Sequence, residues 1–282
     1  MSASGSRTRP RGPGRRAMAP WDTLAADRTH GASELQRRAV VSLRSLVREG
    51  PPRLGDAEVA WLLQWCRGMR AAQPSMGGLV RLADEVSSWV QEEGPEPSRR
   101  GLRALLSGKE RELSREIGDL VRFAARHFPV RAVVVTLSRS STVSEVLCRL
   151  PLRCRPTEVV VLRSLPGGEG ADMARELRAH GLNARVVEDD DLEGALGPSA
   201  VVLVGADTLY ADGTLVHKVG TRRVARTAHR RGVPFIAMVP SSRVLPCRPR
   251  RGRRRPPLFD ETPWRWIGQV WTDRGAWSPP RP

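Results

Sequence analysis

Two side chains, Asp207 and Lys218, could together handle a polar, anionic ligand. The aspartate ends an apolar run, and the lysine follows a short turn and precedes Gly220 and Thr221. Lysine is rare in this chain, which places it only at Lys109 and Lys218 and otherwise uses arginine. A lysine amine has an adjustable pKa whereas a guanidinium stays charged, so this lysine indicates either a chemical role or a chance position in solvent. An acid facing a lysine favours an anionic substrate; the simpler alternative is a turn-capping aspartate and a solvated lysine.

A second candidate is the hydroxyl-rich stretch Ser138 to Thr142, which follows the apolar run RAVVV and opens a predicted helix. Exposed amides and hydroxyls at a helix start suit a phosphate, although an N-cap without a ligand is the simpler interpretation. A third is the turn LRSLPGGEG, which matches neither the dinucleotide-binding nor the P-loop pattern. A glycine-permitted turn explains it more simply.

Residues 129–282 must position these groups, because their pattern alternates short apolar runs with amphipathic stretches. The predicted strands are RAVVVTLS, TEVVVLRS, ARVVE, SAVVLVGAD and VPFIAMV, with QVWTD as a further one. The predicted helices between them are STVSEVLCRL, GADMARELRAHG and HKVGTRRVARTAHRRG. This alternation predicts a Rossmann-like parallel sheet with helices on both faces. Ligands of such sheets bind outside the carboxyl ends of the strands, where Ser138 and Asp207 fall.

Residues 29–128 have helical apolar spacing. One stripe contains Leu35, Ala39, Leu43 and then Leu46 or Val47, and Ser33 is the expected N-cap. Breaks at GPPRLGD and EEGPEPS divide the region into three to five helices. The predicted fold class is therefore α/β, with an N-terminal helical domain followed by the Rossmann-like domain.

The net charge of +17 raises the possibility of nucleic-acid binding. Much of the excess lies in residues 1–28, a predicted disordered basic arm, and in a predicted basic loop at residues 248–257. Nucleic acid is therefore a possible partner but not the favoured one. No apolar run is long enough for a membrane span, so we expect a cytoplasmic protein without a membrane partner. The four cysteines lack metal-site spacing, and we expect no metal, disulfide or cofactor.

Three passages resemble the family that unites the alpha, beta and delta subunits of translation initiation factor 2B with two sugar-phosphate isomerases. Those isomerases act on methylthioribose-1-phosphate and ribose-1,5-bisphosphate. The passages are VVLVGADTLYADGTLVHKVGTRRVARTAHRRGVPFIAMVPSSR, VVVTLSRSSTVSEVL and FDETPWRWIGQVWTDRGAW. The resemblance runs from about Gly31 to Trp277. It implies a helical domain on a Rossmann-like domain, a phosphosugar or nucleotide pocket between them, and a homodimer or higher homo-oligomer.

The resemblance also assigns positions. It places Asp207 on the family's catalytic aspartate and Lys218 on its site lysine, with Gly220 and Thr221 completing the motif. Arg70 falls near a phosphate-contacting arginine of the family.

The sequence departs from the family pattern at three positions. Ser138 stands where the isomerases carry a cysteine, and His217 replaces the asparagine beside the lysine. The turn that usually holds a phosphate-binding arginine has Leu165 instead, so Arg139 or Arg163 would have to supply that charge. A serine hydroxyl, unlike a thiol, cannot titrate near neutrality without a dedicated base.

Three hypotheses follow. The leading one is a protein that binds a phosphorylated sugar or nucleotide without standard isomerase activity. Its expected ligand-binding residues are Arg70, Arg139, Ser140, His217, Lys218, Gly220 and Thr221, beside Asp207 and the altered catalytic position Ser138. The second is an active aldose–ketose isomerase that pairs Asp207 with Ser138 or with His217, since a histidine can titrate near neutrality.

The third hypothesis is a translation-related regulatory or RNA-interacting subunit. The basic segments would supply charge and the C-terminal tryptophans would supply stacking surfaces. The simpler alternative for these tryptophans is packing within the domain or at a dimer interface. They are Trp264, Trp266, Trp271 and Trp277.

Overall fold

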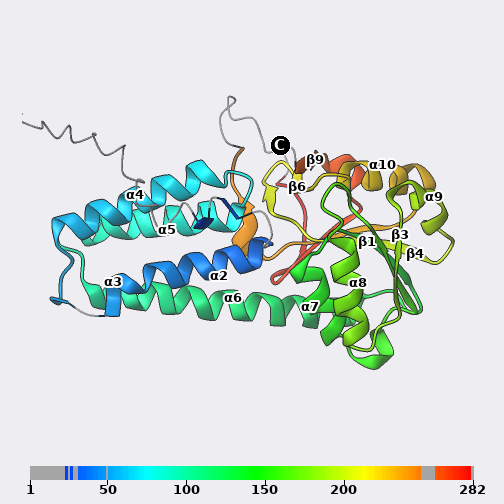
Figure 1. Ribbon diagram of the computed structural model, residues 1–282, viewed down its shortest axis with the longest axis horizontal. Coiled ribbons are helices and arrows are strands. Elements are labelled where there is room, and N and C mark those ends of the chain that lie inside the picture. Colours follow the sequence, from blue (N-terminus) through cyan, green and yellow to red (C-terminus); the bar gives the residue numbers. More distant parts are fainter. Residues whose placement is uncertain (1–22, 25, 28–30, 49, 249–257, 281–282) are drawn as a thin grey trace, which may run out of the picture.

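The computed structural model describes residues 23–24, 26–27, 31–48, 50–248 and 258–280 of the chain. It is elongated, with helices at one end and a sheet covered by helices at the other (Figure 1). Most of the predicted basic arm and nearly all of the predicted basic loop lie outside the described residues. None of the helices within the described ranges is long and apolar enough to span a membrane.

The helical part is built as its apolar spacing predicts. Its elements in the described residues are α2 (Ala32–Leu43), α3 (Ser45–Arg48), α4 (Asp56–Ala72), α5 (Gly77–Glu93) and α6 (Arg99–His127). Leu35, Ala39 and Leu43 of the predicted stripe are fully buried. The expected N-cap was wrong: Gly31 is the N-cap of α2, and Ser33 lies inside the helix. The Ser33 hydroxyl accepts a hydrogen bond from Arg243 instead of capping the helix.

Helix α6 joins the two ends of the molecule. Leu102 and Leu106 near its start pack in the core of the helical part. Leu120 and Ala124 near its end pack in the core under the sheet. Figure 1 shows this helix running along the helical part and reaching the sheet. A single continuous helix thus fixes where the helical part meets the sheet.

The predicted parallel sheet is confirmed. Its order is β11-β10-β7-β4-β1-β2-β3, and every neighbouring pair is parallel except β10 with β11. All six predicted runs form strands of this sheet, and the seventh strand, β11, was not predicted. The bounds are β1 (Val133–Leu137), β2 (Glu158–Leu162), β3 (Ala184–Val187), β4 (Ala200–Val204), β7 (Phe235–Met238), β10 (Gln269–Thr272) and β11 (Gly275–Trp277).

Helices cover both faces of this sheet. The side chains of β1 alternate: Val134 packs with α6 and two further helices, whereas Val135 packs on the opposite face. On the first face lie α7 (Ser141–Arg149) and α8 (Gly170–Ala179), and on the second α9 (Leu192–Ala195) and α10 (Thr221–Arg231). The chain leaves β1 and β4 toward opposite edges of the sheet, so these neighbours form the point where strand order reverses. In open α/β sheets, such a point is the usual place for a ligand.

A second, smaller sheet was not predicted. Its strands, in the order β8-β5-β6-β9, are β8 (Val244–Leu245), β5 (Thr208–Tyr210), β6 (Leu215–Lys218) and β9 (Phe259–Thr262). Strands β5 and β6 form an antiparallel hairpin directly after Asp207. The prediction that placed His217 and Lys218 on a helix was therefore wrong: both residues belong to β6, and α10 begins at Thr221.

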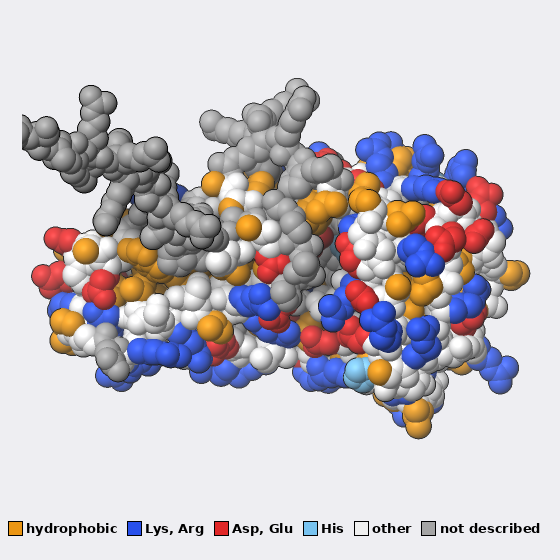
Figure 2. Space-filling view, viewed as in Figure 1, with side chains coloured by type: hydrophobic (Ala, Val, Ile, Leu, Met, Phe, Trp, Pro, Cys, Tyr) orange, Lys and Arg blue, Asp and Glu red, His pale blue; other side chains and the backbone are white. Residues whose placement is uncertain are grey.

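The C-terminal tryptophans pack within the sheet part, as the simpler interpretation predicts. Trp271 is almost completely buried and meets Phe123 of α6 edge-on at 5.7 Å between ring centroids. Trp264 and Trp277 form another edge-on pair at 5.9 Å. Figure 2 shows that arginine and lysine side chains on the visible face are interspersed with acidic ones.

Candidate functional site

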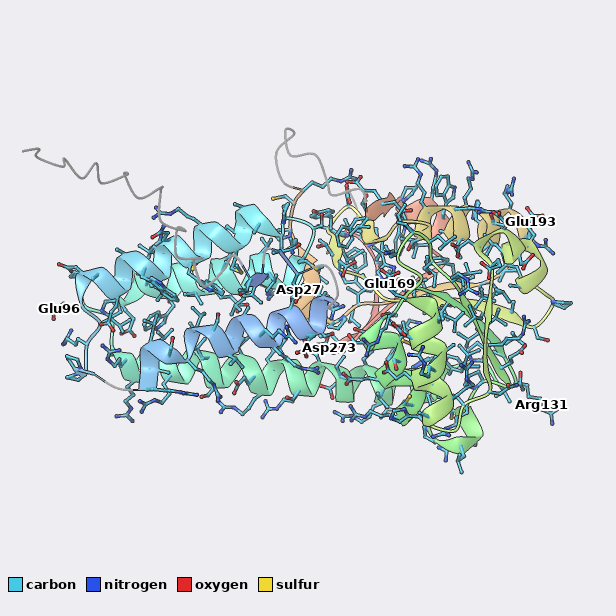
Figure 3. The ribbon with its side chains drawn as sticks, in the orientation of Figure 1. Asp27, Glu96, Arg131, Glu169, Glu193 and Asp273 are labelled. Carbon is cyan, nitrogen blue, oxygen red and sulfur yellow. The ribbon has the colours of Figure 1, made fainter. Side chains whose placement is uncertain are left out.

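A pocket of about 90 Å³ lies where the helical part meets the carboxyl ends of the sheet strands. Asp27, Gln73 and Met76 line it from the helical part. Asp27 and Glu169 line the pocket from the two parts, and Figure 3 shows both in the central region of the molecule. The structure brings five predicted site residues together here: Ser138, Arg139, Asp207, His217 and Lys218.

Asp207 follows β4 and is about 9% exposed. Burial raises the pKa of its carboxyl from 3.8 to about 7, against the opposing effect of Arg243 and Lys218. The Arg243 guanidinium is itself buried and donates a hydrogen bond to the carbonyl of Ala206, beside the aspartate. Asp207 can therefore exchange a proton near neutral pH, as a general acid or base must.

The backbone of Asp207 is fixed by helix α5. The amide of Gly77 donates to the Asp207 carbonyl at 2.9 Å and to the Thr208 hydroxyl at 2.7 Å. The Thr208 hydroxyl in turn donates to the carbonyl of Ser75 at 2.9 Å. The N-terminal end of α5 thus holds the strand end that presents the aspartate.

Replacing Gly77 by Ala is expected to lower the free energy of unfolding by about 2 kcal/mol, because the added methyl overpacks this junction. A Cβ there would lie 2.8 Å from the Arg243 carbonyl oxygen and 2.9 Å from the Thr208 hydroxyl oxygen. Urea denaturation would measure the loss. The matched control is Gly108→Ala in α6, where a Cβ meets nothing within 4 Å. That variant should be as stable as the wild type or gain up to about 1 kcal/mol; an equal loss in both variants would contradict the steric explanation.

Lys218 is nearly buried and forms an ion pair with Glu169, with 2.6 Å between Nζ and Oε1. Glu169 stands at the N-cap position of α8, in the glycine-rich turn that the sequence explained as structural only. Lys218 is therefore not a solvated side chain. It faces the pocket with its charge already matched by a carboxylate.

His217 is held in one tautomer by the motif around it. The Thr221 hydroxyl donates to the Lys218 carbonyl at 2.7 Å, so it must accept the hydrogen bond that links it to His217 Nδ1 at 3.0 Å. The proton is thus on Nδ1, and Nε2 is an acceptor. Burial, reinforced by Arg243 and Lys218, lowers the pKa of His217 to about 3. The expectation that His217 titrates near neutrality is therefore wrong.

Ser138 directly follows β1 and has a left-handed conformation, with φ 59°. Its amide donates to the Ser164 hydroxyl at 2.5 Å, and the Ser164 amide donates to the Asp189 carboxylate at 2.8 Å. These hydrogen bonds connect the loops that follow the adjacent strands β1, β2 and β3. A strained non-glycine backbone held by such bonds is typical of a functional site.

Of three further predicted site residues, Arg139 lines the pocket, whereas Ser140 and Gly220 are not among its lining residues. Arg139 lines the pocket and pairs with Glu176 at 3.2 Å, and Ser140 caps α7 by accepting from the Val143 amide. Gly220, with φ 102°, is the N-cap of α10, and its amide donates to Asp260 at 2.9 Å.

Two arginines lie away from the pocket. The structure does not place Arg70 among the pocket residues: it bonds to Asp84 and Ser87 of α5. Arg163 pairs with Glu188 instead of facing the pocket.

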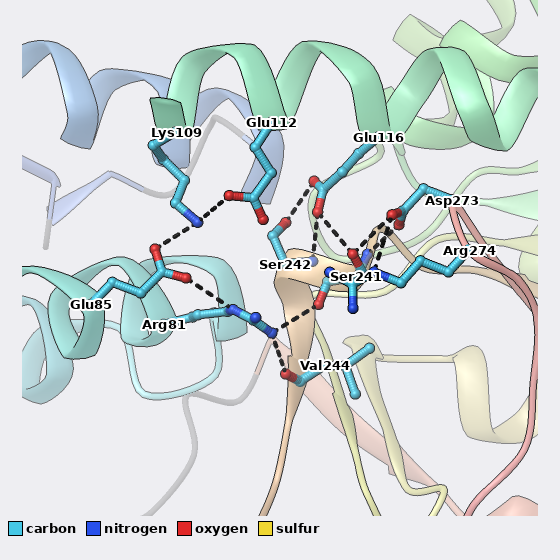
Figure 4. A network of polar contacts seen from close by, with 10 residues as sticks. All are labelled: Arg81, Glu85, Lys109, Glu112, Glu116, Ser241, Ser242, Val244, Asp273 and Arg274. Atoms are coloured by element: carbon cyan, nitrogen blue, oxygen red, sulfur yellow. Dashed lines mark hydrogen bonds and ion pairs between the residues drawn. The ribbon is translucent and has the colours of Figure 1, made fainter. Parts of the chain in front are cut away.

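A buried polar network anchors the loop that carries Arg243. Glu116 of α6 accepts from the Ser242 amide at 2.7 Å and from the Ser242 hydroxyl at 2.8 Å, while Asp273 accepts from the Ser241 amide at 2.6 Å (Figure 4). Nearby, Lys109 pairs with acidic side chains of α5 and α6. The chain's other lysine thus holds two helices together.

Sequence reasoning missed Glu169, Arg243 and Asp189. Glu169 lies in the turn LRSLPGGEG and Arg243 at the end of VPFIAMVPSSR, whereas Asp189 begins the acidic run after the predicted strand ARVVE. Asp189 directly follows a predicted strand, which was an available signal; Glu169 and Arg243 had none. The described residues contain no cluster of His, Cys, Asp and Glu side chains that could hold a metal ion.

Comparisons with known proteins agree on one family. Residues 98–250, more than half of the chain, match the model of the initiation factor 2 subunit family. A translation initiation factor eIF-2B subunit 2-like protein of Pyrococcus horikoshii is 28% identical over 92% of this chain and 95% of its own. The crystal structure of a translation initiation factor eIF-2B from Pyrococcus horikoshii superposes with a TM-score of 0.80, at 26% identity, and covers 93% of this chain and 96% of its own.

A ribose 1,5-bisphosphate isomerase of Archaeoglobus fulgidus is 23% identical over 88% of this chain and 85% of its own. Relatives of this chain thus include initiation-factor-like proteins and a sugar-phosphate isomerase, as the sequence motifs predict. Together with the fold and the pocket, these matches show that the chain belongs to the initiation factor 2 subunit family.

Proposed function

We propose that the protein binds a phosphorylated sugar or nucleotide in this pocket and does not catalyse aldose–ketose isomerisation. The observation that carries the proposal is that Asp207 and Lys218 face the same pocket as Ser138, which stands where the resemblance places a cysteine. The pocket offers backbone, hydroxyl and cationic groups from Ser138 and Arg139 for a phosphate. It offers the carboxyl, ammonium and imidazole of Asp207, Lys218 and His217 for hydroxyl groups.

The same groups argue against turnover. Isomerisation moves a proton between neighbouring carbons and oxygens, which calls for two groups that titrate near the working pH. Asp207 is one such group. His217 stays neutral, and among the described residues no carboxylate or imidazole bonds to the Ser138 hydroxyl. The second group is therefore missing.

Calorimetry of the full chain with ribose phosphates and nucleoside monophosphates tests this function. We expect at least one to bind, and Lys218→Met to weaken that binding about tenfold or more, because one charged hydrogen bond is lost. The exposed Arg175, on the outer side of α8 and paired with Asp172, gives a control in Arg175→Met. Absence of binding to folded protein at millimolar concentration would refute the proposal.

A second candidate, an active isomerase, is favoured by one observation: the pKa of Asp207 is raised to about 7. Turnover of ribose-1,5-bisphosphate or methylthioribose-1-phosphate that disappears in Asp207→Asn would establish it. Failure to turn over either compound would leave the binding function. The predicted homodimer and the cytoplasmic location stay predictions.

A further inference from the structure

Lys218 and Glu169 form a hydrogen-bonded ion pair in which both side chains have little freedom to move. Lys218 lies on strand β6 and is about 8% exposed, so little freedom is left to its stem. The Glu169 carboxylate lies directly against the backbone of Gly167, where an added Cβ would overlap it. One carboxylate oxygen accepts from the lysine, and the other, Oε2, is buried without a hydrogen-bond partner among the described residues.

An unsatisfied carboxylate oxygen beside an ammonium group indicates what the pair would accept. A lysine has three N–H donors, of which one is used here, and Glu169 Oε2 keeps its acceptor capacity. Adjacent hydroxyl groups of a sugar could accept from the lysine and donate to the glutamate at the same time. Glu169 lines the pocket and its side chain is about 32% exposed, so a ligand hydroxyl can approach the carboxylate.

A phosphate suits this pair poorly. The lysine charge is already compensated at 2.6 Å, and a phosphate in the same place would face the glutamate as a like charge. The other acids that line the pocket, Asp27 and Asp207, add to this bias when ionised. Arg139, the remaining cation among the described lining residues, follows β1 beside Ser138. Its pair with Glu176 is longer, at 3.2 Å, and its side chain is more exposed than that of Lys218, so its charge is less compensated.

Building on the proposed function, we propose that the ligand carries a single phosphate, bound at Ser138 and Arg139, and that its neighbouring hydroxyls bind Lys218 and Glu169. Glu169 is then the residue that selects against a second phosphate. The ligand class is a sugar monophosphate or nucleoside monophosphate, and a sugar bisphosphate is disfavoured.

The test compares ribose 1-phosphate, ribose 5-phosphate and ribose 1,5-bisphosphate by calorimetry on the full chain. We expect the wild type to bind one of the monophosphates about tenfold or more tightly than the bisphosphate. In Glu169→Gln, which keeps the side-chain shape and removes the charge, the preference should fall or reverse. Binding of the monophosphate should weaken and binding of the bisphosphate should strengthen, each roughly tenfold.

Glu188→Gln is the matched control, because Glu188 is an exposed glutamate that pairs with Arg163 away from the pocket. It should leave the ratio of affinities unchanged. A wild type that prefers the bisphosphate, or a Glu169→Gln variant with an unchanged ratio, would overturn this inference while the proposed function stands. If none of the three compounds binds, the proposed function fails and the inference fails with it. The wild-type comparison decides the matter even if the variant does not fold.

Discussion

Replacing Asp207 by Asn is expected to raise the free energy of unfolding at about pH 8 by up to about 4 kcal/mol and to change it little near pH 4. Burial raises the pKa of the folded-state carboxyl from 3.8 to about 7. The folded state therefore keeps a proton that the unfolded state has already released. The wild type has its full stability below about pH 4 and loses it as the pH rises toward 7, whereas an asparagine has no proton to lose. Urea denaturation at both pH values would measure the difference.

The control for this prediction lies in the hairpin that follows Asp207. At Asp212, burial raises the pKa, but hydrogen bonds from Thr214 and Arg248 outweigh it and the pKa is lowered. A carboxyl whose pKa is lowered in the folded state stabilises the protein at pH values above its unfolded-state pKa. That stabilisation is lost as the pH falls through the folded-state pKa. Asp212→Asn should therefore destabilise the protein at about pH 8, with the opposite sign to Asp207→Asn. Parallel pH profiles for the wild type and Asp207→Asn would show that the buried carboxyl is not responsible.

A gain in stability from removing Asp207 would also bear on function. Buried ionisable groups cost free energy, and a cluster of them in a pocket indicates a functional site. Asp207 and His217 line the pocket, and the buried Arg243 bonds to the carbonyl beside Asp207. Burial shifts the pKa of each of the three against its charged form. Loss of ligand binding in a more stable Asp207→Asn variant would separate the two roles of this side chain.

The main sheet could be predicted because its signal is local. Strands buried on both faces appear as continuous apolar runs, and Val134 and Val135 of β1 show why: neighbouring side chains enter different cores. The strand ends then follow from the sheet, so Ser138 and Asp207 could be brought to one edge before any coordinates were known. Helix α2 was equally predictable from its stripe of Leu35, Ala39 and Leu43.

The small sheet and half of the site depend on partners that are distant in sequence. Strand β5 has only three residues, and β6 pairs with β9 across the segment that contains α10 and β7, so neither shows a period long enough to recognise. Lys218 therefore looked like the start of a helix. Glu169, Arg243 and Ser33 carry no local mark of their roles, because their partners come from other elements: Lys218 for Glu169, and Ser33 for Arg243.

Truncating Glu116 to Ala is expected to lower the free energy of unfolding by about 3 kcal/mol, measured by urea denaturation. The Ser242 amide and hydroxyl, both inside the structure, would lose their acceptor, while Ser241 would keep Asp273. Because Arg243 follows directly, ligand binding at Asp207 should weaken as well. Glu116→Gln should cause less than half of this loss in the free energy of unfolding, because glutamine keeps an acceptor oxygen. The charge matters less, since burial, together with nearby Asp273, raises the pKa of Glu116.

The variant Asp119→Asn is the control for Glu116→Ala. Asp119 lies one turn further along α6, so this variant removes a negative charge from the same helix without touching the Ser242 hydrogen bonds. It pairs with Arg122 at the surface, and the arginine is 68% exposed. Exposed ion pairs contribute little, so Asp119→Asn should change the free energy of unfolding by less than about 1 kcal/mol. If Glu116→Ala were no worse than Asp119→Asn, the loop would not depend on α6 for its position. If Glu116→Ala unfolds while Glu116→Gln stays folded and binds ligand, the hydrogen bonds of Glu116 are what connect the helical part to the site.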